Sequence, residues 1–212
     1  MAAAPDRADI ALAIARVCRR LYERGLIAGP DGNVSARLGD GSILITPNGR
    51  SKVDVDAASL LRVAPDGQVL DGEGRPSSEM RMHLRIYQRR ADVKAVVHAH
   101  PPVATGFGVA GQSLPASVLP EVILQMGTIP LVPYATPGTD ALPDSMEAFL
   151  MKHDAFLLAN HGATTVGPTL DIAHQRMESL EHAARILLVA RSLGTVNELS
   201  AADVMALHGQ RP

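Results

Sequence analysis

The stretch that decides the fold of this chain is Lys94-Ala95-Val96-Val97-His98-Ala99-His100-Pro101-Pro102. Its apolar residues predict a strand over 94–100, and the two prolines end it, because neither can donate a backbone N–H to a neighbouring strand. Strand side chains alternate between two faces, so His98 and His100 project from the same face. Two imidazoles at the rim of a sheet suit a metal ion, although two histidines on a solvated face explain this stretch equally well.

The composition is that of one globular domain. The chain has 212 residues, 46% of them apolar, and a formal net charge of −2, so we expect a single domain over 1–212 with a substantial core. No basic stripe marks a nucleic-acid partner. Cys18 stands alone, which excludes a disulfide framework and suits a reducing compartment. No signal-peptide pattern or apolar run of membrane-spanning length occurs, so we predict a cytoplasmic protein without a membrane partner.

Helices alternate with strands along the chain. Apolar spacing predicts helices at 7–25, 77–90, 119–126, 141–152 and 168–193. Strands are expected at 34–38, 42–46, 94–100, 130–134, 155–159 and 164–166, with two more short strands and a half-turn of helix within 53–71. The Gly-rich segment 104–110 gives no firm prediction. Hairpin signals at 33–46 and 60–70 exclude a purely parallel sheet, so we expect an α/β layered domain with a mixed or antiparallel central sheet.

A third metal ligand is best supplied by His161, in Leu157-Leu158-Ala159-Asn160-His161-Gly162. Here too an apolar strand delivers a histidine at its end, and the glycine permits a sharp turn. Three histidines with an open position are typical of a catalytic divalent metal, most often zinc. Glu79, at the start of a helix, is a candidate fourth ligand that substrate displaces, or an acid/base beside the metal. Singly, His161 is more readily structural and Glu79 a first-turn helix residue; the functional interpretation depends on their combination with the first pair.

The other histidines give weaker signals. His83 lies one helical turn beyond Glu79, so it either lines the site or packs inside the helix layer, and the second is the simpler interpretation. The remaining histidines sit among polar neighbours, and we expect solvated positions for His153, His174, His182 and His208.

Three short stretches resemble anion cradles: Gly32-Asn33, Asn48-Gly49 and Ser77-Ser78. Each offers exposed N–H groups beside small or hydroxyl side chains, and the last sits at a helix N-terminus, where the dipole favours a phosphate. Each alone is an ordinary turn or cap. If they converge, they form a site for one phosphate group. No Walker-type GxxxxGK[ST] motif occurs, which argues against a nucleoside triphosphate.

Other catalytic chemistries fit the sequence less well. The HEXXH and GxSxG patterns are absent. HxHxDH is absent too, because Pro102 stands where that pattern needs an aspartate. The chain has three lysines, Lys52, Lys94 and Lys152. None has an evident apolar pocket, which weakens a Schiff-base mechanism.

The order of these motifs resembles the class II aldolase/adducin family, and within it the L-fuculose-1-phosphate aldolases. The resemblance covers about 8–194, which leaves a C-terminal tail at 195–212. It is carried by Gly32-Asn33-Val34-Ser35, Ile45-Thr46-Pro47-Asn48-Gly49, Pro76-Ser77-Ser78-Glu79, Val97-His98-Ala99-His100, Pro133-Tyr134-Ala135-Thr136-Pro137-Gly138-Thr139 and Asn160-His161-Gly162. These motifs are specific in combination.

The resemblance implies a single-domain three-layer α/β/α fold with a mostly antiparallel central sheet, assembled as a C4 homotetramer with sites between subunits. It implies a zinc site, for which Mn²⁺ or Co²⁺ could substitute, held by Glu79, His98, His100 and His161. It implies a phosphate site formed by Gly32, Asn33, Asn48, Gly49, Ser77 and Ser78. The activity implied is aldol cleavage of a 2-ketose 1-phosphate to dihydroxyacetone phosphate and an aldehyde, through a zinc-stabilised enediolate that Glu79 protonates.

Two departures from the family pattern leave the substrate open. The fuculose-phosphate enzymes have a tyrosine proton donor from a neighbouring subunit where this chain has Leu119, and the tail lacks their second tyrosine. Glu121, nearby, is similar in position to the acid/base glutamate of methylthioribulose-1-phosphate dehydratases, or is a first-turn helix carboxylate after Pro120. Candidate substrates are therefore L-fuculose 1-phosphate and a 5-deoxy- or 5-methylthio-pentulose 1-phosphate. The alternatives are a sugar-phosphate dehydratase or tetronate-phosphate decarboxylase with Glu121 moving the proton, and a non-catalytic adducin-like interaction module.

Overall fold

The stretch with two histidines lies in the middle of the sheet. In the computed structural model, which describes residues 6–209, it forms strand β5 (Ala95–Ala99), between β1 (Asn33–Arg37) and β8 (Gly162–Gly167). The remaining strands are β2 (Ile43–Ile45), β3 (Leu61–Val63), β4 (Val69–Asp71), β6 (Leu131–Val132) and β7 (Ala155–Leu158). The sheet order is β4-β3-β2-β1-β5-β8-β7-β6, and β6–β7 is the one parallel pair among the described strands. The predicted mostly antiparallel sheet is confirmed.

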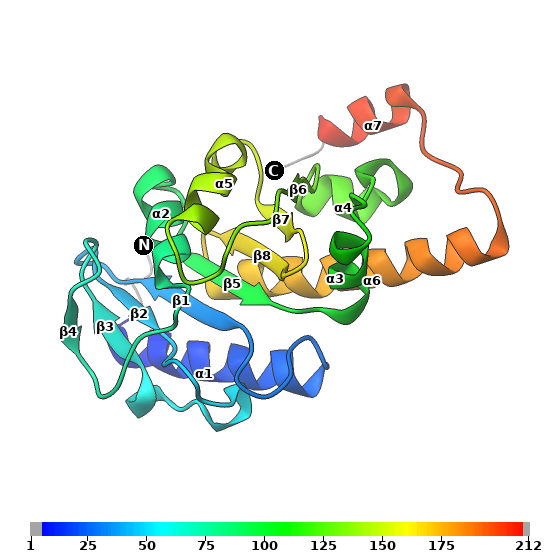
Figure 1. Cartoon of the computed structure of the whole chain (residues 1–212). Helices are drawn as coiled ribbons and strands as arrows, with labels where there is room; N and C mark the ends of the chain where they lie inside the picture. Colours follow the sequence, from blue (N-terminus) through cyan, green and yellow to red (C-terminus); the bar gives the residue numbers. More distant parts are fainter. Residues whose placement is uncertain (1–5, 210–212) are drawn as a thin grey trace.

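Helices cover both faces of this sheet (Figure 1). They are α1 (Arg7–Glu23), α2 (Met80–Arg89), α3 (Pro102–Val109), α4 (Pro120–Gln125), α5 (Ala141–Leu150), α6 (Leu170–Leu193) and α7 (Ala201–His208), with short 3₁₀ helices η1 (Lys52–Asp54), η2 (Ala57–Ser59) and η3 (Ala116–Val118). The side chains of α1, α3 and α6 pack in one apolar cluster with Val97, and those of α2 and α5 in a second cluster with Val96. Strand alternation thus divides the core into two layers, which confirms the α/β/α arrangement, and directs His98 toward α2.

The start of α2 differs from the prediction. The sequence pattern placed it at residue 77, but the helix begins at Met80, with Glu79 as its N-cap residue. The backbone N–H of Ser77 instead donates to the Thr46 carbonyl at 3.1 Å, and Pro47 and Pro76 form a β-bridge. Ser77 and Ser78 are therefore held beside the loop after β2, and the helix starts only once the chain has left that loop.

Helix α3 was not predicted, because its glycines lower helix propensity. Its N-terminus is instead held by a distant carboxylate: Glu181, 3% exposed on α6, accepts from the N–H groups of Val103 and Ala104 at 3.1 and 2.9 Å. A negative charge at this end also favours the helix dipole. Gly108 lies so close to the backbone that its missing Cβ would be 3.2 Å from the Leu158 carbonyl. Gly108 thus permits close packing of α3 on β7.

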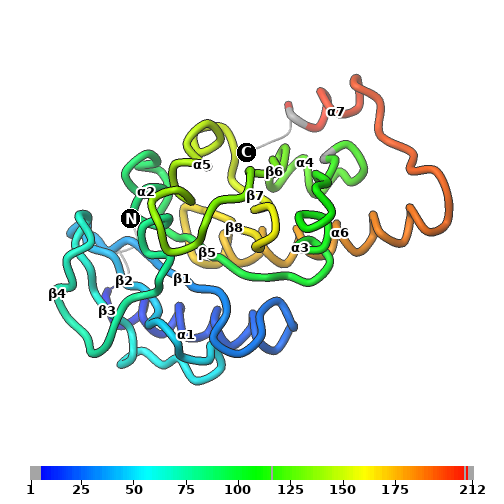
Figure 2. Tube along the Cα trace, in the orientation of Figure 1, coloured from blue at the N-terminus to red at the C-terminus, as the bar shows by residue number. Residues whose placement is uncertain are grey.

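The segment after α6 turns back along the molecule, so that α7 lies beside α4 (Figure 2). The Leu199 N–H donates to the Ser117 carbonyl at 2.7 Å. The single domain predicted over 1–212 and the tail predicted at 195–212 also include 1–5 and 210–212, which lie outside the described residues. Within the described part of the chain, none of the helices has the length and apolar character needed to cross a membrane.

We expect Glu181→Ala to lower the free energy of unfolding by about 2 kcal/mol, because two buried N–H groups at the start of α3 lose their acceptor. Urea denaturation measures this. Glu178→Ala is the matched control on the same helix. Glu178 makes a surface ion pair with Arg24, which is worth less than about 1 kcal/mol, and a longer contact of 3.8 Å with His174. Equal losses in the two variants would contradict the assignment.

Candidate active site

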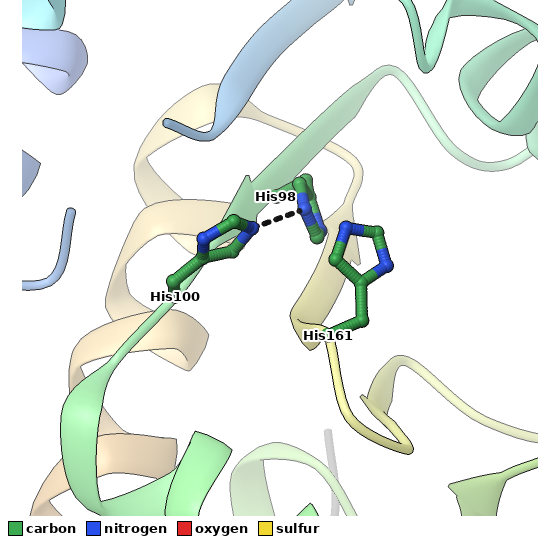
Figure 3. Close-up of side chains that lie close together, drawn as sticks. All are labelled: His98, His100 and His161. Atoms are coloured by element: carbon green, nitrogen blue, oxygen red, sulfur yellow. Dashed lines mark hydrogen bonds between the residues drawn. The ribbon is translucent and has the colours of Figure 1, made fainter. Parts of the chain in front are cut away.

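Three histidines converge at the end of β5 (Figure 3). One nitrogen each from His98, His100 and His161 lies within 4.8 Å of the others, and the Nε2 atoms of His98 and His100 are 3.2 Å apart. His161 enters from the β7–β8 turn, where Asn160 has a positive φ of 55°. The residue after His161 must be glycine, because a Cβ on Gly162 would lie 2.6 Å from the Ala99 carbonyl oxygen. The predicted convergence of the three imidazoles is thus observed.

Glu79 lies among these imidazoles. Its Oε2 is 3.0 Å from His98 Nε2, and its Oε1 is 2.8 Å from His161 Nε2. The amide of Asn33 donates to Oε2 at 2.8 Å. Burial would raise the pKa of this carboxyl, but the imidazoles and the Asn33 amide outweigh it and hold the pKa below its usual value. Glu79 is therefore a carboxylate at neutral pH.

The four side chains fit a divalent metal ion. Burial lowers the pKa of His98 to about 3 and also lowers that of His100, so both imidazoles offer a lone pair at neutral pH. His98 Nδ1 is bonded to the Thr164 hydroxyl at 3.1 Å, which leaves Nε2 for a metal. Glu79 Oε1, although close to His161, has no hydrogen-bond partner among the described residues. An ion shared by these groups would satisfy that buried oxygen.

A cavity of about 280 Å³ adjoins the histidines, and all three predicted anion cradles border it. Its lining includes Gly32, Asn33, Asn48, Gly49, Ser77, Ser78, Glu79, His100 and His161. Gly32 has φ of 71°, and a Cβ there would lie 2.7 Å from the His98 carbonyl oxygen, so only glycine lets this loop approach β5. The convergence required of a phosphate site is present, although one side chain is already engaged: the amide of Asn33 is bonded to Glu79 and His83.

Lys52 is a site residue that the sequence analysis missed. Its side chain is 1% exposed and borders the cavity, a burial that the sequence pattern did not predict. Its Nζ donates to the carbonyls of Pro30 and Arg50 at 2.8 and 2.9 Å, and so joins the two loops that carry the first two cradles. Burial lowers the pKa of Lys52. The available signal was its position three residues after Gly49.

The remaining histidines divide differently from the prediction. His83 is fully buried behind Asn33 and does not line the cavity, as the simpler interpretation has it. His182 is exposed and His153 half-buried, as expected for polar surroundings. The solvated position predicted for His174 is wrong, because this residue is 1% exposed on α6. The side chain of His208 is outside the described set.

Glu121 does not reach the cavity within one chain. It is exposed in the first turn of α4 and borders a separate groove of about 470 Å³ between α4 and α6, together with Leu119, Arg24 and His182. Its predicted role as an acid/base therefore requires the site of a neighbouring subunit and stays a prediction.

We expect the purified protein to bind about one divalent ion per chain, and His100→Ala to weaken that affinity at least tenfold, because a three-histidine site loses a ligand. Elemental analysis and competition with a chelator measure this. His182→Ala, an exposed histidine outside the cluster, is the control and should bind metal as the parent does. Unchanged affinity in His100→Ala would contradict the metal site.

Comparison with known proteins places these motifs in a family context. The family model described as Class II Aldolase and Adducin N-terminal domain matches residues 12–188. The 3-oxo-tetronate 4-phosphate decarboxylase of Escherichia coli is 35% identical over 178 residues, which cover 82% of this chain and 84% of that protein. The L-fuculose phosphate aldolase of Methanococcus maripaludis is 34% identical, over 84% of this chain and 96% of its own. The crystal structure of YgbL from Escherichia coli has a TM-score of 0.90 at 32% identity and covers 95% of this chain and 99% of its own.

Proposed function

This chain belongs to the class II aldolase and adducin family, and from that premise we propose that it decarboxylates 3-oxo-tetronate 4-phosphate or a closely similar 3-oxo acid phosphate. The observation that carries the proposal is the cavity in which the histidine cluster, Glu79 and three N–H-rich loops adjoin one another. The likeness to decarboxylases of that name supports the choice of substrate.

The proposed reaction breaks one carbon–carbon bond and takes up one proton. In 3-oxo-tetronate 4-phosphate the carboxylate is C1, a hydroxyl is on C2, the ketone is C3 and the phosphate is on C4. Breaking the C1–C2 bond releases CO₂ and leaves its electron pair in an enolate over C2, C3 and the ketone oxygen. One proton added at C2 then gives dihydroxyacetone phosphate.

The residues of the chain divide these tasks between them. His98, His100 and His161, with Glu79, would hold a divalent ion, zinc in our proposal with Mn²⁺ or Co²⁺ as substitutes; when bound, it would polarise the ketone as a Lewis acid. The three cradles bind the phosphate near the start of α2. The N–H groups of Asn48 and Ser77 are already bonded to the Arg75 and Thr46 carbonyls, so these two residues contribute their side chains. Lys52 supplies positive charge behind two of these loops. Glu79 is a carboxylate in the free site, so the proton that C2 receives comes from solvent water, and Glu79, buried beside the histidines, accepts that proton and passes it to C2.

The missing tyrosine favours decarboxylation over aldol cleavage. Aldol cleavage needs a group that exchanges a proton with the oxygen of the departing aldehyde. Leu119, which stands at or near the tyrosine position of the fuculose-phosphate enzymes, cannot do so. CO₂ departs without taking or giving a proton, so a single acid/base such as Glu79 is sufficient.

Aldol cleavage of a 2-ketose 1-phosphate is the second candidate. The relative from Methanococcus maripaludis, named an L-fuculose phosphate aldolase, supports it at nearly the same identity. Both substrates contain the same unit, a phosphate ester beside a ketone and a hydroxyl-bearing carbon. The same cavity therefore suits L-fuculose 1-phosphate or a 5-deoxy- or 5-methylthio-pentulose 1-phosphate.

We also propose a homotetramer of single-domain subunits, in which the α4–α6 groove meets the cavity of a neighbour. Several large apolar side chains on α6, Leu188, Val189 and Leu193, are exposed in one chain and support an interface there. Glu121 would reach the substrate only in such an assembly. With Glu121 at the site of a neighbour, a dehydratase of the methylthioribulose type is a further alternative.

The two leading reactions are separated by the second product, because both yield dihydroxyacetone phosphate. Metal-loaded protein is incubated with 3-oxo-tetronate 4-phosphate and, separately, with L-fuculose 1-phosphate. We expect CO₂ from the first and no aldehyde from the second, with Glu79→Gln at least about 100-fold slower because the proton donor is lost. Release of an aldehyde without CO₂ would establish the aldolase instead.

We expect Lys52→Met to raise the KM for the phosphorylated substrate about tenfold, because the cavity loses its buried positive charge and two loops lose their shared donor. Steady-state kinetics measure it. Lys94→Met removes an equal charge from an exposed position and should leave KM unchanged. If the two variants behave alike, Lys52 has no part in phosphate binding.

A further inference from the structure

A chain of buried hydrogen bonds runs behind the Glu79 carboxylate, between β1 and α2. The Tyr87 hydroxyl is 2.8 Å from Ser35 Oγ, which is 2.6 Å from His83 Nδ1. His83 Nε2 is 2.5 Å from the Asn33 amide oxygen, and the Asn33 amide nitrogen is 2.8 Å from Glu79 Oε2. All five side chains are buried. The proposed reaction does not use Tyr87, Ser35 or His83.

The direction of the last two links follows from what each group can donate. A carboxylate only accepts hydrogen bonds, so the NH₂ end of the Asn33 amide must face Glu79. The carbonyl end of the same amide then faces His83. A carbonyl oxygen also only accepts, so His83 must carry its hydrogen on Nε2.

The direction of the first two links follows in the same way. Burial lowers the pKa of His83 to about 4, so this imidazole is neutral at neutral pH and has one N–H group. With that hydrogen on Nε2, Nδ1 can only accept, and the Ser35 hydroxyl must donate to it. The Ser35 oxygen then accepts from Tyr87, whose pKa burial raises, so that the phenol keeps its hydrogen. Every hydrogen in the chain points toward Glu79.

We propose that Ser35, His83 and Tyr87 are positioning residues that lock the Asn33 amide in the orientation required to hold the Glu79 carboxylate. The inference rests on the proposed function for the role of Glu79, but the hydrogen-bond direction does not. Because the amide carbonyl is bonded to His83 and one amide hydrogen to Glu79, one hydrogen of Asn33 remains for the substrate. Asn33 thus acts first on the acid/base and only secondarily on the phosphate.

The Ser35 hydroxyl affects the Asn33–Glu79 hydrogen bond without touching Glu79, and this effect can be tested. Without its hydroxyl, Nδ1 of His83 loses its donor, and a hydrogen on Nε2 is favoured only by the Asn33 carbonyl, which can itself turn over. The other tautomer would direct a lone pair at the Asn33 carbonyl, and two acceptors would then face each other. The amide would have to turn over, which directs its carbonyl at the Glu79 carboxylate. Glu79 would lose its donor although the substituted residue does not touch it.

The first experiment requires no substrate. Long-range ¹H–¹⁵N NMR spectra of ¹⁵N-histidine-labelled protein, metal-free and zinc-loaded, report which nitrogen of each imidazole carries hydrogen. We expect His83, assigned by its absence in His83→Gln, to be the Nε2–H tautomer in the parent and to lose that preference in Ser35→Ala. A cationic or Nδ1–H imidazole at position 83 in the parent would overturn the inference.

The second experiment measures turnover. We expect Ser35→Ala to lower kcat about tenfold and to raise KM by a smaller factor, because the Asn48-Gly49 and Ser77-Ser78 cradles are untouched. Tyr87→Phe should have a smaller effect of the same kind, since Ser35 still donates to His83. Thr165→Val is the control: its hydroxyl is equally buried and donates to the Ala173 carbonyl at 2.7 Å, on the face of the sheet opposite His98.

The outcomes separate positioning from stability. If Thr165→Val destabilises the protein as much as Ser35→Ala and lowers kcat equally, the chain is only structural and the inference is overturned. If the parent has the expected tautomer but turns over neither class of substrate, the proposed function fails while the direction of the hydrogen bonds stands.

Discussion

The close approach of two loops to the end of β5 is the constraint on which the site depends. A Cβ on Gly32 would lie 2.7 Å from the His98 carbonyl oxygen, and one on Gly162 would lie 2.6 Å from that of Ala99. Both contacts are too short for any side chain. The glycines therefore allow the loop before β1 and the turn before β8 to meet β5 from opposite sides. This closure brings Asn33 and His161 to the histidines of β5.

Strand pairing then fixes which side chains face one another. In the β1–β5 register Asn33 is opposite His98, and in the β5–β8 register Thr164 is opposite the same histidine. The neighbours on both sides of His98 are therefore polar and of fixed position. Thr164 engages Nδ1, while Asn33 holds the carboxylate beside Nε2. A one-residue slip in either pairing would replace the neighbour on that side of His98 with a residue of the opposite face.

Local patterns predicted the parts of the site that local rules control, and missed those that distant contacts control. Strand alternation and the glycine after His161 were enough to predict the three histidines. Helix α3 could not be predicted, because its first turn is held by Glu181, which lies on the last long helix. The burial of Lys52 was equally hidden, since its acceptors are backbone carbonyls of two other loops. Carbonyl positions leave no pattern in a sequence.

The same contrast between local patterns and distant contacts explains why the sequence indicates the family but not the leaving group of the reaction. The groups that would bind the phosphate, the ketone and the adjoining carbon all come from one chain, and all except His98 border one cavity. The reactions considered for this family differ only in what departs from that carbon, an aldehyde or CO₂. Residues such as Leu119 and Glu121, which would discriminate between these groups, border a different groove of the same chain. In the assembly that we propose, these residues would meet the cavity of a neighbouring subunit, and a substitution at either position should alter the choice of leaving group without altering metal affinity.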